Sequence, residues 1–230
     1  MLVTVLGCGG IGVPAAWTLA LAGVKQLRLI DGDRVELSNL HRQVLYSTAD
    51  IGQPKAEVLA RALQQRFPDL RYEVTVMQAT VDNFDALLQN CTYLLEASDQ
   101  AELKFIASDW AIQQPRQRTV TIAAAIGRRG QWLTVTPQSA CYRCIFEAPP
   151  PPELLSTCQI AGVLGPAVGQ VGAFAARSLV RAMRGQAEGA IDGLIRLQPQ
   201  GITRIGVQKA EACICATPPQ KSVNSAEFAA

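Results

Sequence analysis

The sequence predicts an α/β fold, Rossmann-like and doubly wound, around one mostly parallel sheet with a C-terminal antiparallel extension. Three observations support this prediction. Short apolar runs alternate with longer segments of helical character, which is typical of βα units joined by right-handed crossovers. The first apolar run ends in a glycine-rich loop. Apolar residues make up 49% of the 230 residues, enough for one large core. We therefore expect a single domain over residues 1–216.

The first half of the chain carries the clearest alternation. Residues 2–6 are an apolar run that ends at Gly7, as a fully buried strand does. The segment that follows is small and apolar, and residues 54–67 repeat apolar side chains at helical spacing. Residues 33–48 are polar and irregular, which indicates a loop or a short helix. We expect strands at 2–6, 26–31, 72–77 and 92–95, and helices at 11–21, 54–67, 83–89 and 101–113.

The second half begins with two further strands and then changes character. We expect strands at 119–125 and 131–135, on either side of a turn. Four consecutive prolines at 149–152 exclude a helix there. The predicted elements after them are a long helix at 166–183 and a hairpin of strands at 194–197 and 202–207. Residues 217–230 are polar, and we expect a flexible C-terminal tail.

Composition argues against several classes of protein. The net charge is only +2 and 17% of the residues are charged, without a long basic stretch, which disfavours nucleic-acid binding. Residues 154–176 carry no charge, but their glycines, glutamines and Pro166 favour a buried loop and helix over a membrane span. The first residues lack the basic start of a secretory signal. We expect a cytoplasmic protein that binds neither membrane nor nucleic acid.

The glycine loop predicts a nucleotide site. Gly7, Gly9, Gly10 and Gly12 fit the spacing G-x-G-x-x-G between a strand and a helix, and the next predicted strand ends at Asp31. Glycines let the backbone approach a phosphate, and a helix N-terminus offers free N–H groups. An acid at the end of the second strand can accept hydrogen bonds from ribose hydroxyls. The motif by itself does not distinguish NAD, FAD and ATP.

A second motif distinguishes among these nucleotides. Residues 31–43 read D-G-D-R-V-E-L-S-N-L-H-R-Q, and residues 52–55 read G-Q-P-K. These segments resemble the signatures of the ThiF/MoeB/HesA family, which are relatives of the ubiquitin-activating enzymes. The resemblance continues through residues 97–99, 141–144, 157–158 and 162–166. It implies an adenylyltransferase that joins AMP to the C-terminal carboxylate of a ubiquitin-like sulfur-carrier protein ending in Gly-Gly, releasing pyrophosphate, in thiamine- or molybdopterin-type sulfur transfer.

The residue types suit that chemistry. Adenylation brings together a carboxylate and a triphosphate, so it needs cations and a metal ion to offset the negative charge. Arg42 and Lys55 are suitable phosphate cations, and the resemblance assigns Mg²⁺ to Asp99. His41 is the only histidine, and it lies inside the predicted phosphate loop, so the usual histidine-based triads are hard to build. The resemblance implies that ATP is bound by Gly7, Gly9, Gly10, Gly12, Asp31, Asp33, Ser38, Asn39, Leu40, Arg42, Gln43, Lys55 and Asp99.

The cysteines indicate a metal site and a reactive residue. Four of the seven form two close pairs, Cys141/Cys144 and Cys213/Cys215, and they resemble the family's structural four-cysteine zinc site. The second pair is C-x-C where the family has C-x-x-C, which leaves the fourth ligand open. In the ThiF branch a cysteine at the place of Cys158 can link to the sulfur carrier, and the alternative is a plain loop cysteine.

The chain also departs from the family pattern. Relatives begin with an arm whose arginine reaches the partner subunit's ATP, whereas the first strand here starts at residue 2. Gln100 stands where relatives have asparagine, and Lys104 replaces an arginine. The resemblance still implies a homodimer packed through the helix at 166–183, and a sulfur donor of the cysteine desulfurase or rhodanese type. Two alternatives stay open, an NAD- or FAD-dependent oxidoreductase and a non-catalytic carrier-binding homologue.

Overall fold

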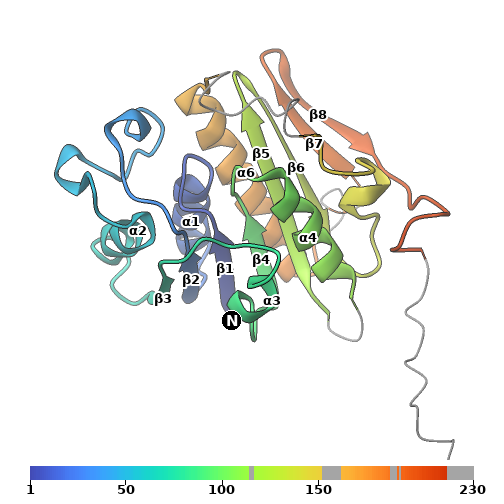
Figure 1. The fold of residues 1–230 in the computed structure, drawn as a ribbon, viewed down its shortest axis with the longest axis horizontal. Coiled ribbons are helices and arrows are strands. Elements are labelled where there is room, and N and C mark those ends of the chain that lie inside the picture. Colours follow the sequence, from blue (N-terminus) through green and yellow to red (C-terminus); the bar gives the residue numbers. More distant parts are fainter. Residues whose placement is uncertain (114–116, 152–161, 187–190, 192, 217–230) are drawn as a thin grey trace, which may run out of the picture.

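A computed structural model describes residues 1–113, 117–151, 162–186, 191 and 193–216 of the chain. One eight-stranded sheet runs through it in the order β3-β2-β1-β4-β5-β6-β7-β8 (Figure 1). β1 to β5 are parallel, and β6, β7 and β8 pair antiparallel beyond them. The predicted fold class is confirmed. The strands are β1 Leu2–Leu6, β2 Gln26–Ile30, β3 Arg71–Thr75, β4 Tyr93–Glu96, β5 Thr119–Ile126, β6 Arg129–Val135, β7 Gly193–Gln198 and β8 Gly201–Gly206.

Helices cover both faces of the sheet. α1 (Gly12–Leu21), α2 (Lys55–Gln64) and α6 (Gly165–Met183) bury their apolar sides against one face. α3 (Phe84–Leu87) and α4 (Ala101–Ile112) pack on the other (Figure 1). All the predicted helices and strands are present in the structure, with bounds that differ by a few residues at most. Within the described residues, no helix has the length and apolar character needed to cross a membrane.

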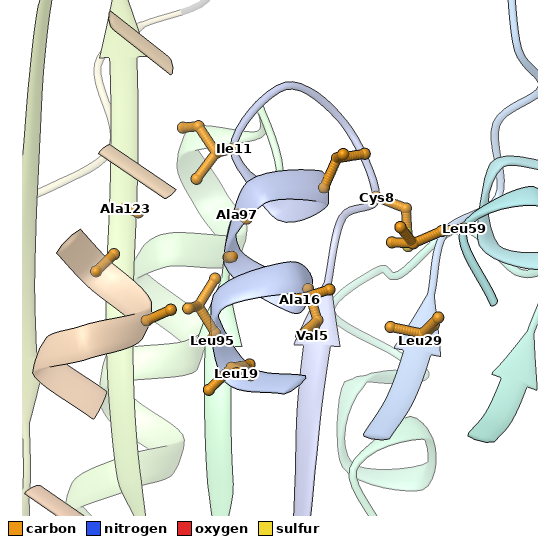
Figure 2. Close-up of a cluster of buried hydrophobic side chains, with 14 of the residues drawn as sticks. Val5, Cys8, Ile11, Ala16, Leu19, Leu29, Leu59, Leu95, Ala97 and Ala123 are labelled. Atoms are coloured by element: carbon orange, nitrogen blue, oxygen red, sulfur yellow. The ribbon is translucent and has the colours of Figure 1, made fainter. Parts of the chain in front are cut away.

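The core around α1 fixes the strand from which the glycine loop leaves. Figure 2 shows Ala16 and Leu19 of α1 in one cluster with Val5 of β1, Leu95 of β4 and Leu29 of β2. All five side chains are buried. Because β1 is covered on both faces, its end has a defined position relative to the strands on either side.

The order of the strands places the ligand site. The chain runs from β1 outward to β2 and β3, and then returns to form β4 on the other side of β1. In open parallel sheets of this kind, ligands bind outside the carboxyl ends of the strands where the winding reverses. Here that point lies between β1 and β4.

The antiparallel strands extend this sheet toward the C-terminal part. β5 and β6 form a long hairpin. β6 also pairs antiparallel with β7, which forms a second hairpin with β8. On the α6 side, Trp132 stacks on Phe174 with ring centroids 5.8 Å apart and donates its indole N–H to Ser178 at 3.0 Å. These contacts hold α6 against β6, so the extension is part of the same packed body.

Candidate active site

A cavity of about 560 Å³ opens at the point where the winding of the sheet reverses. The glycine loop and the ends of β2 and β4 form one side, and β5, β6 and β7 continue its wall. The structure brings most of the predicted nucleotide-binding residues to this one cavity. They are Gly7, Gly9, Gly10, Asp31, Asp33, Arg42, Gln43, Lys55 and Asp99.

Two glycines of the loop are needed for its shape. Gly7 has φ +92°, and a Cβ there would lie 2.8 Å from the carbonyl carbon of Ala97 at the end of β4. A Cβ at Gly12 would lie 1.8 Å from the carbonyl oxygen of Gly7. Gly12 does not line the cavity, so its role is the close contact between the loop and α1. Gly9 and Gly10 present the open backbone of the loop to the cavity.

Tyr46 anchors the glycine loop from beneath, and the sequence analysis did not identify it. Its hydroxyl donates to the carbonyl oxygen of Cys8 at 2.7 Å and lies 3.2 Å from that of Lys55. Burial raises the pKa of Tyr46 well above its ordinary value, so the hydroxyl keeps its proton and its role as a donor. One side chain thereby ties the loop to the start of α2.

Asp31 is held in place at the end of β2. Its Oδ2 accepts the backbone N–H of Cys8 at 2.6 Å, and its Oδ1 accepts that of Asp33 at 2.8 Å. Burial raises the pKa of Asp31, and these two hydrogen bonds act in the opposite direction. The carboxylate therefore has a fixed orientation at the cavity wall before any ligand arrives.

The two predicted phosphate cations both reach the cavity. Lys55 is only 8% exposed, and its Nζ lies 2.7 Å from Oδ2 of Asp33. Arg42 is half-buried, and its Nη1 donates to the carbonyl oxygen of Ser38 at 3.0 Å. Its aliphatic stem passes close to Gly10. Two cations from different segments thus flank the glycine loop.

Three residues of the second motif lie off the cavity. Ser38 is exposed and donates to Glu36 at 3.1 Å, whereas Leu40 packs against the core. Asn39 is buried, with its Oδ1 lacking a hydrogen-bond partner among the described residues. Gln43 is 2% exposed, lines the cavity, and has an equally unpartnered Oε1 within that part of the chain. The unpartnered amide of Gln43 is the one that a ligand in the cavity could satisfy.

A buried ion pair supports the end of β4. Glu96 is fully buried, and its Oε2 lies 2.8 Å from Nζ of Lys104 on α4. Lys104 also donates to the carbonyl oxygens of Ser98 at 2.8 Å and Ala123 at 2.9 Å. Glu96 accepts both the backbone N–H and the hydroxyl of Ser98. The next residue, Asp99, is exposed and lines the cavity, so the ion pair fixes the turn that carries it.

The sequence analysis noted Lys104 only as a departure from the family and missed Glu96. The available signal was the charge at the end of an otherwise apolar strand, because a buried acid needs a partner. The predicted Cys158 and the tail at 217–230 lie outside the described residues.

The four paired cysteines meet at a second site. The Sγ atoms of Cys141 and Cys213 are 3.4 Å apart, and those of Cys144 and Cys215 are 3.3 Å apart. All four sulfurs lie within 4.8 Å of one another. Zinc–sulfur bonds of about 2.3 Å put tetrahedral ligands about 3.8 Å apart, so this donor set fits the ion. The C-x-C spacing leaves none of the four sulfurs out.

The thiols of this cluster differ in their pKa: burial raises the pKa of Cys141 and of Cys215, whereas that of Cys144 is lowered. Burial acts to raise the pKa of Cys144, but hydrogen bonds from the backbone N–H groups of Ala210 and Cys141 outweigh it and lower the pKa to about 7. Metal ions bind the thiolate form of cysteine. The cluster joins the η3 turn (Tyr142–Cys144) to the segment that ends the described chain.

Comparison with known proteins agrees with this geometry. The model of the ThiF family matches residues 1–213. The chain is 36% identical over 185 residues to the adenylyltransferase and sulfurtransferase MOCS3 of Danio rerio, covering 80% of this chain and 40% of that protein. It is 35% identical over 189 residues to a sulfur carrier protein adenylyltransferase of Thermus thermophilus, covering 80% of this chain and 69% of that protein.

Solved structures share the fold. Escherichia coli MccB, crystallised with AMPCPP and MccA, superposes with a TM-score of 0.77 at 20% identity, covering 94% of this chain and 66% of MccB. The chain spans about 40% of the length of MOCS3 and of UBA4 from Vanderwaltozyma polyspora, to which it is 35% identical over 176 residues, or 76% of this chain. On the extent of the family match and these identities, the chain belongs to the ThiF family.

Proposed function

We propose that the protein binds ATP in the cavity and adenylates the C-terminal carboxylate of a ubiquitin-like sulfur-carrier protein ending in Gly-Gly. The observation that carries the proposal is the meeting of Arg42, Lys55 and Asp99 beside the glycine loop. The relationship to the sulfur carrier protein adenylyltransferase of Thermus thermophilus supports a sulfur carrier as the acceptor. Hydride transfer by an NAD- or FAD-dependent oxidoreductase would not call for this set of phosphate cations.

The cavity offers a separate place for each part of ATP. The loop at Gly9 and Gly10 and the N-terminus of α1 suit the phosphates. Asp31 is oriented to accept hydrogen bonds from the ribose hydroxyls, and Met77 and Leu103 add apolar surface for the base. The fixed carboxylate and the backbone cradle both favour a nucleotide over a ligand without a ribose.

The chemistry requires charge neutralisation more than proton transfer. An ionised carboxylate oxygen of the carrier attacks the α-phosphorus, the bond from that phosphorus to the bridging oxygen breaks, and pyrophosphate leaves. Arg42 and Lys55 offset the charge of the two anionic reactants. Asp99 would hold Mg²⁺, which supplies further neutralisation of the phosphate oxygens. Because the acceptor is already ionised near neutral pH, the step needs no protein base.

The four-cysteine cluster would hold a structural zinc ion. Four thiolates in a closed tetrahedron favour zinc and leave no position for a substrate. The ion would join the segment around Cys213 and Cys215 to the turn around Cys141 and Cys144. The ion would stabilise the folded protein, because the free energy of metal binding at such a site adds to the free energy of folding.

Further parts of the proposal concern the organisation of the protein. We propose one adenylation domain over residues 1–216, followed by a flexible tail, in a cytoplasmic homodimer packed through α6. A sulfur donor of the cysteine desulfurase or rhodanese type would convert the acyl-adenylate to a thiocarboxylate. Cys158 would link to the carrier in that step. The choice between a thiamine-type and a molybdopterin-type pathway depends on the carrier.

Pyrophosphate exchange into ATP with a carrier ending in Gly-Gly tests the proposal. We expect exchange that depends on the carrier, and we expect Lys55→Ala to slow it by about 10²- to 10³-fold, as loss of one cation at a reacting phosphate does. Lys25→Ala, at a residue outside the cavity lining, is the matched control and should leave the rate unchanged. ATP binding without exchange, for any such carrier, would instead support the non-catalytic homologue.

A further inference from the structure

One wall of the cavity is not used by the proposed ATP site. It is formed by β6 and β7, where Gln131 pairs with Arg196 and Gly130 with Leu197 in antiparallel register. Side chains of paired residues, and of residues two positions away, share one face of a sheet. Four polar side chains on this face line the cavity, namely Arg129, Gln131, Arg196 and Gln198.

The two arginines of this wall have no acidic partner. Among the described residues, neither Arg129 nor Arg196 forms an ion pair or a side-chain hydrogen bond. Two other cations of the cavity lining are paired, Lys55 with Asp33 and Lys104 with Glu96, whereas Arg42 donates to the carbonyl oxygen of Ser38 beside the glycine loop. Within the part of the chain that the structure describes, the wall therefore presents two positive charges without an acidic partner to the cavity.

The position of the wall separates these charges from the proposed phosphates. β6 lies three strand positions from β1, across β4 and β5, and β7 lies one position farther. At about 4.8 Å between neighbouring strands, β6 is about 14 Å from the strand that carries the glycine loop. The phosphates already have Arg42, Lys55 and the loop backbone at the β1 end. The β6–β7 wall is thus the part of the cavity that the proposed phosphate site leaves for the acceptor.

We propose that Arg129 and Arg196 recognise an acidic side chain in the C-terminal tail of the carrier protein. The inference rests on the proposed function, and it names a feature of the substrate that decides which carrier is accepted. An extended chain advances about 3.4 Å per residue, so a span of about 14 Å corresponds to an acid about four residues before the terminal glycine. Gln131 and Gln198 flank the arginines and can bond to the backbone of the same tail.

The two arginines of the β6–β7 wall should chiefly affect how tightly the carrier binds. Arg129 is exposed and Arg196 is half-buried, so water screens their interaction with a carboxylate in part. Each contact should therefore alter the affinity for the carrier, and the rate of its capture, more than the chemical step. ATP affinity should not depend on either arginine.

A peptide-binding experiment tests this directly. The probes are synthetic peptides that end in a free Gly-Gly carboxylate and carry glutamate, glutamine or lysine at successive upstream positions. Their affinities are measured by fluorescence anisotropy with the protein saturated by a non-hydrolysable ATP analogue. We expect the glutamate peptide to bind most tightly, with the largest advantage about four residues from the end.

Variants of the wall complete the design. Arg129→Gln should weaken binding of the glutamate peptide on the order of fivefold, a typical value for a partly exposed charge pair. Arg129→Glu should weaken it further and should restore binding of the lysine peptide. Arg128→Glu is the matched control, because this exposed neighbour makes the same change of charge outside the cavity lining. It should leave the order of peptide affinities unchanged.

Several results would overturn the inference. These are equal affinity for the three peptides, absence of binding by any of them, or an equal effect of the Arg128 and Arg129 substitutions. A loss of ATP affinity in Arg129→Glu with unchanged peptide preference would assign the arginines to the triphosphate instead. Carrier-dependent exchange that ignores tail charge would overturn only this inference, whereas absence of exchange with every carrier would contradict the proposed function itself.

Discussion

The two ends of the cavity differ in how their charged groups are held. At the end formed by β1, β2 and β4, Asp31 accepts two backbone hydrogen bonds, Lys55 pairs with Asp33, and Lys104 pairs with Glu96. At the end formed by β6 and β7, Arg129 and Arg196 have no such partners among the described residues. Preorganisation suits a ligand that never varies, such as ATP. Free charges suit a partner that brings its own counter-charges.

The cavity end formed by β1, β2 and β4 is also held by buried side chains beneath it. Glu96 and Tyr46 are buried, and each bonds to backbone that leads directly to the cavity. The exposed β8 edge has no comparable cover, since all six of its residues are exposed. If this comparison is right, substitutions beneath the first end should lower stability as well as activity. Substitutions on the β6–β7 wall should alter partner choice alone.

The largest effect is expected from breaking the buried ion pair. Lys104→Met leaves the carboxylate of Glu96 buried without its cation, which typically costs about 3–5 kcal/mol of unfolding free energy. Urea denaturation at neutral pH measures the change. Because the pair also fixes the turn before Asp99, exchange activity should fall in the residual folded protein.

Two further variants separate charge from packing at this pair. The double variant Glu96→Gln with Lys104→Met removes both charges and should recover most of the lost stability. Lys104→Arg keeps the cation and restores the residue that the family resemblance implies. If Lys104→Met alone proves as stable as the double variant, the ion pair is not what supports the end of β4.

The pH dependence of ATP binding probes Asp31. In the proposed site this carboxylate accepts hydrogen bonds from the ribose hydroxyls, which its ionised form does more strongly, and burial raises its pKa above the ordinary value. Affinity for ATP should therefore fall as the pH is lowered through that raised pKa, by at most about tenfold per pH unit below it. Isothermal titration calorimetry across the acidic range measures this fall.

The stability of the fold has the opposite sign for the same group. A pKa that is higher in the folded than in the unfolded chain means that folding takes up a proton, so protonation of Asp31 favours the folded state. Loss of ATP binding on acidification would therefore not arise from unfolding through this residue. Asp31→Asn is the control: protonation of the triphosphate affects both proteins, and only the wild type should show the additional loss.

The sequence was sufficient to predict the order of the elements and to select residues that, for the most part, line one cavity. Apolar runs, glycines and the motif around Arg42 are local signals, and local signals were what the predictions used. Ser38, Asn39 and Leu40 were predicted to bind the nucleotide as well, and these three, in and beside the η1 turn (Leu37–Asn39), do not line the cavity. A motif indicates a segment more reliably than it indicates each side chain.

The features that the sequence did not indicate depend on contacts between distant residues. Tyr46 meets Cys8 across 38 positions, and no local signal predicts that contact. The family resemblance predicted that Cys141 meets Cys213 across 72 positions, but not that all four sulfurs come together. The pairing of Gln131 with Arg196 is likewise a matter of strand register. No spacing rule relates such residues in advance, so the completeness of the cysteine cluster and the charged wall became visible only in three dimensions.

The smallest loss of stability is expected from a change at Tyr46, whose hydroxyl holds the glycine loop. Tyr46→Phe removes the hydroxyl that bonds to Cys8 and Lys55 but keeps the buried ring. The buried carbonyl oxygen of Cys8 then loses its donor, which should cost about 1–2 kcal/mol of unfolding free energy. The measurement is urea denaturation of the variant, with ATP affinity determined on the same preparation.

If the two ends of the cavity act independently, Tyr46→Phe should affect only the end that contains the glycine loop. A loosened glycine loop should weaken ATP binding, while the preference among carrier-tail peptides should stay the same because the β6–β7 wall is untouched. Tyr72→Phe is a matched control, since the hydroxyl of Tyr72 has no hydrogen-bond partner among the described residues. Equal losses in the two variants, or a changed peptide preference in Tyr46→Phe, would mean that the two ends of the cavity do not act independently.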